Sequence, residues 1–375
     1  MLLSAMFLMA CNNEDDIPAE ECYLEVYVYA PGHAIITRAD VGTVAPSVAE
    51  ENRVNNLKIW VYRHGDGRLV SYKDTTATYL NEAAGQEKFM MKVDRTFAGS
   101  PENVDVYVVA NAKSCGLSSL DESTTRAQLD AAQISGNYFG TKELTQSVPD
   151  GPDGGLPMSA VLRNQPVTGH FPTLRIGTAS QMATMELTRA VSKMRFVICR
   201  VNEESTADKQ LVGIDDISLD ARQIPDASYV IPREDHSGYT YSHEAISFGG
   251  VAKGDIPQVK DPLIYVYETQ KAQEYEDLIN AAVNAGKLKQ IGLTYFRESP
   301  KQISGTIKYT HTKGGIHQET VDFSISTPGD FLRNHTWIVY IYFMDSTVHV
   351  LTITDIGVKD WVKDPEEEDV TFHNW

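Results

Sequence analysis

Short segments with alternating apolar and polar residues recur along most of this 375-residue chain. Alternation of this kind places the apolar side chains on one face of a β-strand. Turn-forming residues separate the segments, and helical spacing is confined to residues 123–134 and 272–287. Many short strands with few helices are typical of antiparallel β-sandwiches. The chain is therefore expected to be all-β, with a few short helices.

The expected strands are spread over the whole chain. Residues 104–110 are nearly continuous in valine, which predicts a central strand buried on both faces. Residues 64–67 contain two glycines and predict a hairpin turn after a strand at 54–62. Ser123 or Thr124 is expected to cap the first helix. The other strands are expected at 23–29, 88–93, 185–201 (two abutting strands), 211–219, 263–267, 291–296, 303–310, 320–325, 336–343 and 348–358.

The chain is longer than a single hydrophobic core usually supports, so two domains are expected. The junction between the two strands within residues 185–201 places their boundary near residue 187. Residues 54–187 would form an N-terminal sandwich and residues 188–363 a C-terminal sandwich. Each half then has enough apolar residues for a core of its own.

The charge of the chain restricts its partners. It carries 51 acidic against 33 basic residues, a formal net charge of −18. Such a balance argues against binding to nucleic acid and against electrostatic binding to anionic membrane surfaces. Solubility is the simplest reason for the excess of acids.

The usual signatures of catalysis and of metal binding are missing from the sequence. It has no GxSxG, HExxH, phosphate-binding loop or CxxC motif, and its ten histidines are scattered. Asp215 and Asp216 are neighbours on an expected strand and would point to opposite faces. Asp150 and Asp153 lie in a turn-rich loop without the further acids of an EF-hand. We therefore expect no enzyme activity, no metal and no cofactor.

The N-terminus resembles a lipoprotein signal. Residues 2–10 are apolar and end at Cys11, a run too short to span a bilayer. Residues 1–11 are interpreted as a signal whose true start lies upstream, with Cys11 as the lipidated first residue of the mature protein. The remaining cysteines, Cys22, Cys115 and Cys199, are odd in number and predict no disulfide framework. Cys199 lies within an apolar strand pattern and is expected in the core.

Residues 12–53 combine an acidic spacer, a strand and a loose tether. Leu24, Val26 and Val28 share one face of the strand at 23–29. Arg38 follows in a stretch without regular pattern, where a trypsin-like protease could reach it. If the strand fills a groove in its own sheet, cutting between Arg38 and Ala39 would release it and open an edge for another chain's strand. The alternative is an ordinary first strand followed by an incidental arginine.

Residues 364–375 form a hinge and an extended end. Asp364-Pro365-Glu366-Glu367-Glu368 is unsuited to a sheet. Beyond it Val370 and Phe372 share a face, and Trp375 follows, so this segment is a candidate donor strand. Residues 348–358, taken as one strand, would have to supply further apolar side chains. The alternative is a last strand that pairs within its own domain.

Several short motifs in this order resemble the type V pilins, or fimbrillins, of Gram-negative anaerobes. They extend over essentially the whole chain after Cys11. The resemblance rests on the following stretches: 8–11 (LMAC), 37–39 (TRA), 55–61 (NNLKIWV), 108–112 (VVANA), 156–159 (LPMS), 187–193 (LTRAVSK), 265–268 (YVYE) and 332–335 (LRNH).

The resemblance implies two tandem transthyretin-like Greek-key β-sandwich domains. It also implies export as a lipoprotein to the outer membrane, cleavage after Arg38 by a trypsin-like surface protease, and polymerisation with other pilin subunits by donor-strand exchange. A fimbrial subunit of this kind would act in adhesion, through a host protein or glycan receptor. Because the chain has both a cuttable arginine and a candidate donor, a shaft subunit is favoured.

Two alternatives remain open at this stage. One is the tip adhesin of the same pilus, and the other is a glycan-binding surface lipoprotein that does not polymerise. Trp60, Tyr239, Tyr241 and Trp337 could stack on sugars, although such residues more often pack in a core. Trp60 shares the less apolar face of the strand 54–62 with Lys58.

Overall fold

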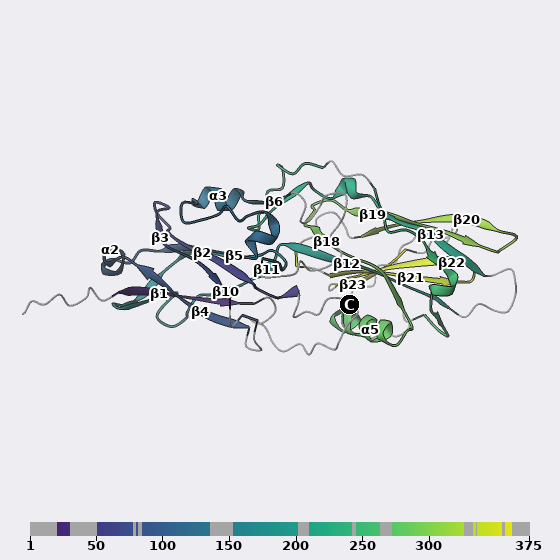
Figure 1. Cartoon of the computed structure of the whole chain (residues 1–375), viewed down its shortest axis with the longest axis horizontal. Coiled ribbons are helices and arrows are strands. Elements are labelled where there is room, and N and C mark those ends of the chain that lie inside the picture. Colours follow the sequence, from purple (N-terminus) through teal and green to yellow (C-terminus); the bar gives the residue numbers. More distant parts are fainter. Residues whose placement is uncertain are drawn as a thin grey trace, which may run out of the picture.

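The structure is a computed structural model that describes residues 21–30, 51–77, 80–81, 85–135, 153–201, 210–241, 245–262, 272–325, 333–334, 336–354 and 357–361. Most of these residues lie in β-strands, which confirms the expected all-β fold. Two pairs of sheets lie end to end along the long axis of the molecule (Figure 1).

The strands of the first pair of sheets lie between residues 22 and 189. Its first sheet, sheet A, has the order β10-β1-β9-β8, and β4 also pairs with β1. Its second sheet, sheet B, has the order β11-β7-β5-β2-β3. The strands of sheet A are β1 (Cys22–Tyr29), β4 (Gln86–Val93), β8 (Val167–His170), β9 (Thr173–Ile176) and β10 (Thr184–Glu186). Those of sheet B are β2 (Asn56–Arg63), β3 (Leu69–Thr76), β5 (Val104–Ala110), β7 (Met158–Gln165) and β11 (Thr188–Arg189).

The second pair follows the same plan. Sheet D has the order β17-β12-β21-β22-β23, with β18 also paired to β12, and sheet F has the order β15-β13-β19-β20, with β16 also paired to β13. Sheet D contains β12 (Val191–Val201), β17 (Gln258–Val259), β18 (Lys289–Arg297), β21 (Thr336–Met344), β22 (Thr347–Thr354) and β23 (Gly357–Trp361). Sheet F contains β13 (Leu211–Leu219), β15 (Ile246–Ser247), β16 (Val251–Ala252), β19 (Ile303–His311) and β20 (His317–Ile325).

The strand pairing is mixed, whereas purely antiparallel sandwiches were expected. Strand β12 runs parallel to β21 over residues 193–200 and antiparallel to β18 on its other side. Strand β1 likewise has parallel and antiparallel neighbours. Alternation along one strand is the same for either direction of pairing, so it could not predict this difference.

Strand β5 is buried along its whole length, as its valine-rich sequence predicted. It lies between β2 and β7, with one face against the core shared with sheet A. Helix α3 (Arg126–Ala131) lies beside its other face (Figure 1). The Tyr107 hydroxyl donates to Asp130 of this helix over 3.3 Å.

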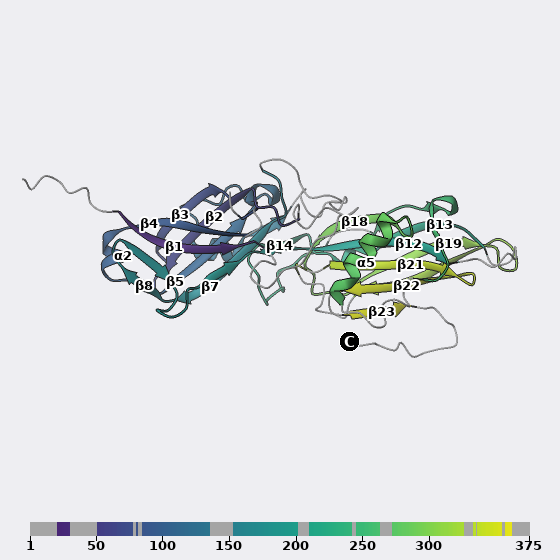
Figure 2. The same ribbon diagram turned by 90° about the horizontal axis from the view of Figure 1, so that it is seen from below.

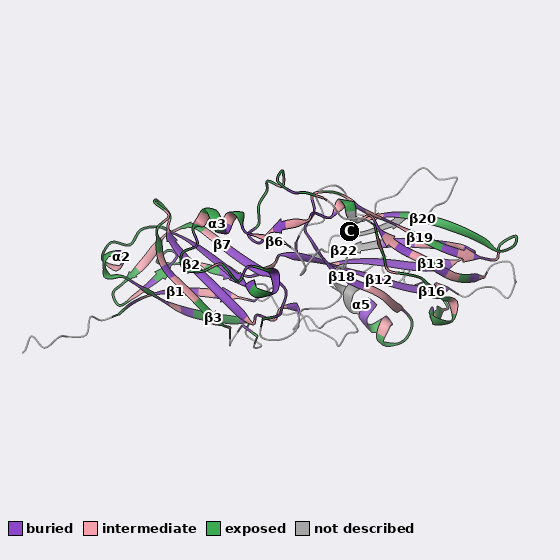
Figure 3. Ribbon diagram, turned by 45° about the horizontal axis from the view of Figure 1, so that its top comes forward, coloured by how far each residue is buried: buried purple, intermediate pink, exposed green. Residues whose placement is uncertain are grey.

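Strand β2 is buried on both faces, although its alternation predicted one polar face. Figure 3 shows this burial, and it shows that much of the edge strand β20 is exposed. Residues 118–121 cover the outward face of β2 and accept hydrogen bonds from it. Lys58 Nζ donates to the carbonyl of Leu120, and Trp60 Nε1 donates to the carbonyl of Asp121 over 2.7 Å. The aromatic and cationic side chains are therefore satisfied by carbonyl groups of a covering loop.

The helices are shorter than predicted. Helix α3 begins after Thr125, which forms a capping box with Gln128, so the expected cap at Ser123 or Thr124 is wrong. Ser123 and Thr124 instead bond to Asp121 in the preceding turn. Helix α5 (Ala272–Asn284) occupies most of the second helical stretch. Short helical turns that the pattern did not predict are α2 (Arg95–Gly99), η1 (Ala112–Cys115), η4 (Ala221–Gln223) and η5 (Lys253–Asp255).

Residues 348–358 are not one strand. Strand β22 ends at Thr354 and turns back as β23, with Thr354 opposite Gly357. Val348 and Val350 are fully buried in the core between sheets D and F. Strand β22 pairs with β21 on one side and with β23 on the other, so its apolar side chains already belong to this domain.

A short segment of the second half pairs with a strand of the first half. Strand β14 (Ala227–Tyr229) pairs with β6 (Gln133–Ser135), and Val230 packs in the core of the first sandwich. The Val230 carbonyl accepts from Ser159 Oγ at 2.6 Å and from Arg333 Nη1 at 2.8 Å. Arg333 is buried and also pairs with Glu298 at 2.6 Å. The two halves are thus joined by buried polar contacts as well as by the chain.

Asn111 is expected to be a large local contributor to stability. It is fully buried with φ of 55°, accepts from the Asn55 amide, and donates to the carbonyls of Arg53 and Leu156. Asn111→Ala should lower the free energy of unfolding by about 3 kcal/mol, because buried partners lose their hydrogen bonds. Chemical denaturation measures this change.

Asn164→Ala is the matched control. Asn164 also has a left-handed backbone, with φ of 53°, but its side chain is exposed and accepts only from Asn103 among the contacts described. Both variants incur the same backbone strain, so their difference reports the buried hydrogen bonds. Equal losses in the two variants would contradict this assignment.

Candidate functional site

Strand β1 lies in the interior of sheet A. It pairs antiparallel with β4 along its whole length, from Cys22 opposite Val93 to Tyr29 opposite Gln86. On its other side it pairs in parallel with β9 and then with β10. Figure 2 shows β1 crossing the first half of the molecule beside β4. Its removal would therefore leave two backbone edges facing each other.

The inward face of β1 is apolar and buried. Leu24, Val26 and Val28 are each at most 1% exposed and pack in the core of the first sandwich, so their predicted common buried face is confirmed. Burial of an aliphatic side chain contributes roughly 1.5–3 kcal/mol. These three side chains therefore stabilise the position of β1 by several kcal/mol.

The outward face of β1 carries a buried carboxylate between two cations. Glu25 accepts from Lys88 Nζ of β4 at 3.2 Å and from Arg175 Nε of β9 at 3.0 Å. Its side chain is only 6% exposed, whereas those of Lys88 and Arg175 are 45% and 61% exposed. Burial raises the pKa of Glu25, but hydrogen bonds and positive charge from the two cations outweigh it, so the pKa lies below the ordinary value.

Backbone hydrogen bonds hold both ends of β1. The Tyr23 amide donates to the Pro172 carbonyl at 2.9 Å. At the other end the Ala30 amide donates to Gly85, and the Leu187 amide donates to the Tyr29 carbonyl. The strand is therefore held from its first residues to its last.

Glu51 holds the chain at the far end of the tether. Its carboxylate is 3% exposed and lies 2.9 Å from Lys193 Nζ and 3.2 Å from Arg189 Nη1. The Tyr295 hydroxyl also donates to it at 2.8 Å. These residues line a cavity with room for about one water molecule. Because Arg189 belongs to sheet B and Lys193 to sheet D, Glu51 joins the two halves.

Several predicted site residues lie outside the residues that the structure describes. They comprise the lipidation site Cys11, the processing site Arg38 and Ala39, and the candidate donor residues Val370, Phe372 and Trp375. The expected strand at 263–267 lies outside them as well. The described part of the candidate site is therefore β1, its neighbours and the anchor at Glu51.

The aromatic residues considered for sugar stacking are covered. Trp60 is 0% and Trp337 3% exposed. The ring of Tyr239 is 8% exposed and stacks on Tyr229 at 5.5 Å between centroids. Lys301 Nζ lies 3.3 Å from the centroid of the Tyr241 ring. These residues pack within the fold and present no open stacking platform.

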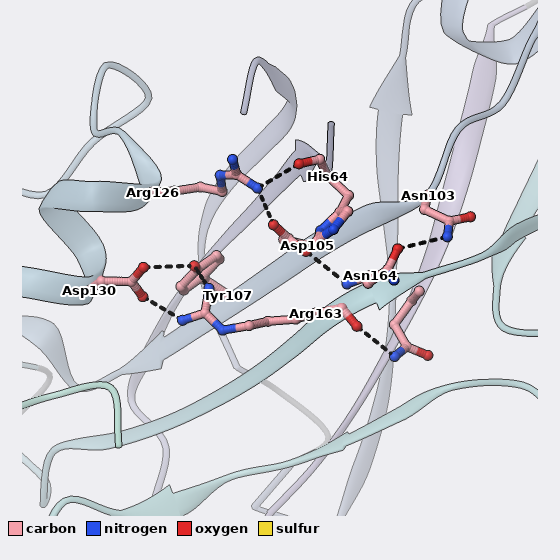
Figure 4. A network of polar contacts seen from close by, with 9 residues as sticks. His64, Asn103, Asp105, Tyr107, Arg126, Asp130, Arg163 and Asn164 are labelled. Atoms are coloured by element: carbon pink, nitrogen blue, oxygen red, sulfur yellow. Dashed lines mark hydrogen bonds and ion pairs between the residues drawn. The ribbon is translucent and has the colours of Figure 1, made fainter. Parts of the chain in front are cut away.

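A second polar cluster lies at the end of sheet B (Figure 4). Asp105 of β5 is buried and accepts from His64 Nδ1 at 2.7 Å, from the Asn164 amide at 2.8 Å and from Arg126. Burial raises the pKa of Asp105, but these hydrogen bonds outweigh it and hold the pKa below the ordinary value. Both carboxylate oxygens are used within the fold, so the cluster connects β5, β7 and α3 with the turn that follows β2.

The cysteines and other ligand types show no metal site within the described ranges. Cys22, Cys115 and Cys199 are free and buried, and burial raises the pKa of Cys199 to about 11. No group of three or more His, Cys, Asp or Glu residues in this part of the chain could hold a metal ion. The helices described are also too short or too polar to cross a membrane.

The ion pairs of Glu25 make the stability of the first sandwich depend on pH. A carboxyl with a lowered pKa stabilises the fold above its unfolded pKa, and this contribution disappears as the pH falls through its folded pKa. Glu25→Gln should therefore lower the melting temperature by about 2–4 °C at pH 7, corresponding to about 1 kcal/mol. Calorimetry from pH 7 to about pH 3 should show this difference disappearing. A difference that stays constant with pH would contradict the assignment.

A comparison with known protein families finds a match that includes most of β1. Residues 24–189 match the family model described as the major fimbrial subunit protein (FimA). No curated protein matches the chain in sequence.

Solved structures of fimbrial proteins resemble the chain at low sequence identity. The tip fimbrial protein Mfa3 from Porphyromonas gingivalis, with a C-terminal truncation, is 14% identical, with a TM-score of 0.44 over 89% of this chain and 99% of that one. A fimbrial assembly protein from Parabacteroides distasonis is 14% identical, with a TM-score of 0.44 over 95% and 100%. A fimbrilin from P. gingivalis is 13% identical, with a TM-score of 0.44 over 86% and 89%.

The match to the family model begins within β1 and runs through the first pair of sheets to β11. It thus includes the strand, its inward apolar face and the neighbours that pair with it. Over residues 24–189 the chain is therefore similar to the major fimbrial subunit family.

Proposed function

We propose that this chain is a structural subunit of a cell-surface fimbria that polymerises by donor-strand exchange and has no catalytic role. Cys11 carries the lipid that attaches the precursor to the outer membrane, and a trypsin-like surface protease cuts between Arg38 and Ala39. The observation that carries the proposal is the interior position of β1, because the segment containing Arg38 joins this strand to the residues that follow it.

The pairing of β1 explains why cleavage and assembly would be coupled. While the chain is intact, β1 satisfies the edges of β4, β9 and β10 and fills the apolar groove, so the uncut protein is a monomer. Loss of β1 exposes two rows of backbone groups and an apolar surface. A strand from a neighbouring subunit restores both the hydrogen bonds and the burial.

We propose that the donor follows β23. Because β22 is an interior strand with buried valines, it cannot leave its sheet without disrupting the second core. The remaining candidate in the C-terminal region is residues 369–375, with Val370, Phe372 and Trp375 as its apolar side chains. About 23 Å of extended chain in these seven residues matches the length of residues 23–29.

Adhesion to a host protein or glycan follows from the proposed place in a surface fimbria. A tip adhesin or a non-polymerising glycan-binding lipoprotein would share the family fold but would not both accept and donate a strand. Polymerisation of the cut chain therefore separates the shaft subunit from both alternatives.

Limited trypsin treatment of the full chain should give a new N-terminus at Ala39 and then polymer. Arg38→Ala should block both events, because β1 would then stay covalently joined to the rest of the chain. N-terminal sequencing and size-exclusion chromatography measure the two outcomes. Polymer from the uncut Arg38→Ala protein would contradict the proposed mechanism.

Arg53→Ala is the matched control and should change neither outcome. The Arg53 carbonyl accepts from Asn111, and the Val54 amide and carbonyl both bond to the Asn81 side chain. These bonds hold the peptide group after Arg53 in place and protect it from cleavage. A first cut at Val54 would show that the releasable segment ends elsewhere.

Deletion of residues 369–375 should leave the protein folded but unable to polymerise after trypsin. The segment lies at the C-terminus beyond an acidic, proline-containing hinge, so we expect it to contribute little to either core. Circular dichroism checks the fold, and size-exclusion chromatography checks the polymer. Undiminished polymer formation would place the donor elsewhere and favour the tip-subunit alternative.

A further inference from the structure

The position that β1 occupies between β4 and β9 is called the groove here. Three cationic side chains lie along its outward side. Lys88 and Lys92 project from β4 on one side of β1, and Arg175 projects from β9 on the other. We call these three residues the cationic rim. Two acids meet them. Glu25 of β1 pairs with Lys88 and Arg175, and Glu21, the residue before β1, pairs with Lys92 at 2.5 Å.

Glu25 is the central contact of this arrangement. It lies opposite Arg175 in the register of β1 with β9, and its carboxylate also reaches Lys88, so it bridges the two sides of the groove. If β1 leaves, Lys88 and Arg175 remain on either side of the empty position without their shared carboxylate. Like charges held near each other repel, and an incoming carboxylate relieves this repulsion.

The inward, apolar face of the groove discriminates less between different incoming strands. Apolar residues at every second position are common to many strands of this chain, such as β13 and β19. An apolar stripe therefore accepts many strands, whereas a carboxylate requirement at one register position rejects most of them. A misregistered strand would also place an apolar or basic residue between the two cations.

We propose that the cationic rim selects the incoming strand and its register by requiring an outward carboxylate at the position of Glu25. This inference rests on the proposed function, because it assumes that β1 is replaced. The occupant is the C-terminal segment of a second copy of this chain, with Asp369 in the position of Glu25, so that residues 369–373 take the positions of residues 25–29 when the incoming strand runs in the direction of β1.

The sequence of that segment fits the requirement. With Asp369 facing outward between Lys88 and Arg175, Val370 is one position and Phe372 three positions away, so both fall on the inward, apolar face. Glu367, two positions before Asp369, falls on the same outward face and adds attraction to the cationic rim.

A peptide competition on the full-length, trypsin-cut protein tests the proposal. Synthetic peptides of residues 364–375, one with the natural sequence and one with Asp369→Asn, are added while polymer growth is followed by light scattering. The natural peptide should stop growth, and the Asp369→Asn peptide should need about a tenfold higher concentration, because it lacks a charge-assisted contact. Raising the salt concentration should reduce this ratio.

A variant with a neutral groove shows whether the cationic rim causes the difference in potency between the two peptides. In the full-length variant E25Q/K88Q/R175Q the resident strand and the groove lose their charges together, so no buried carboxylate is left without a partner. The two peptides should then stop growth at concentrations within about twofold of each other. The matched control K113Q/R222Q neutralises the exposed ion pairs Lys113–Asp153 and Arg222–Asp220 and should keep the tenfold ratio.

The possible results separate this inference from the proposed function. Equal potency of the two peptides on the unmodified groove overturns the carboxylate requirement and leaves strand exchange standing. A tenfold ratio that persists in E25Q/K88Q/R175Q also overturns it, because Asp369 then acts elsewhere. If neither peptide affects polymer growth, the assignment of the C-terminal segment as the occupant is wrong. If the cut protein forms no polymer at all, the proposed function and this inference fail together.

Discussion

The insertion of β1 between β4 and the pair β9 and β10 is the contact on which the first half of the structure depends. An edge strand contributes one ladder of hydrogen bonds, whereas β1 contributes a ladder on each side and a row of buried aliphatic side chains. Without it, β4 would lose its partner in sheet A. A strand with this role can be replaced by another strand but cannot simply be lost.

Two buried carboxylates stand on either side of the segment that contains Arg38. Glu25 fixes β1 before it, and Glu51 fixes the chain after it by pairing with Arg189 and Lys193. A cut between them would therefore free β1 while Glu51 continues to join the two halves. The same chemistry holds the resident strand in place and, on our proposal, recognises its replacement.

Local pattern predicted the strands better than their partners. The strands at 104–110, 211–219 and 336–343 follow directly from alternating or continuous apolar residues. The outward face of β2 was misjudged because a loop 60 residues away covers Lys58 and Trp60. The strand at 348–358 was misjudged because the sequence pattern does not mark the end of β22 at Thr354, whereas the pairing of β22 with β23 shows two strands.

The sequence by itself determined the all-β class, the buried face of Leu24, Val26 and Val28, and the family resemblance, because alternation and short motifs are local properties. Only the tertiary structure decided that β1 is an interior strand and that its neighbours are parallel on one side and antiparallel on the other. It alone brought Arg175 to Glu25 across 150 residues of sequence. Pairing between distant segments depends on how whole sheets pack, and no local pattern encodes which strand will lie beside which.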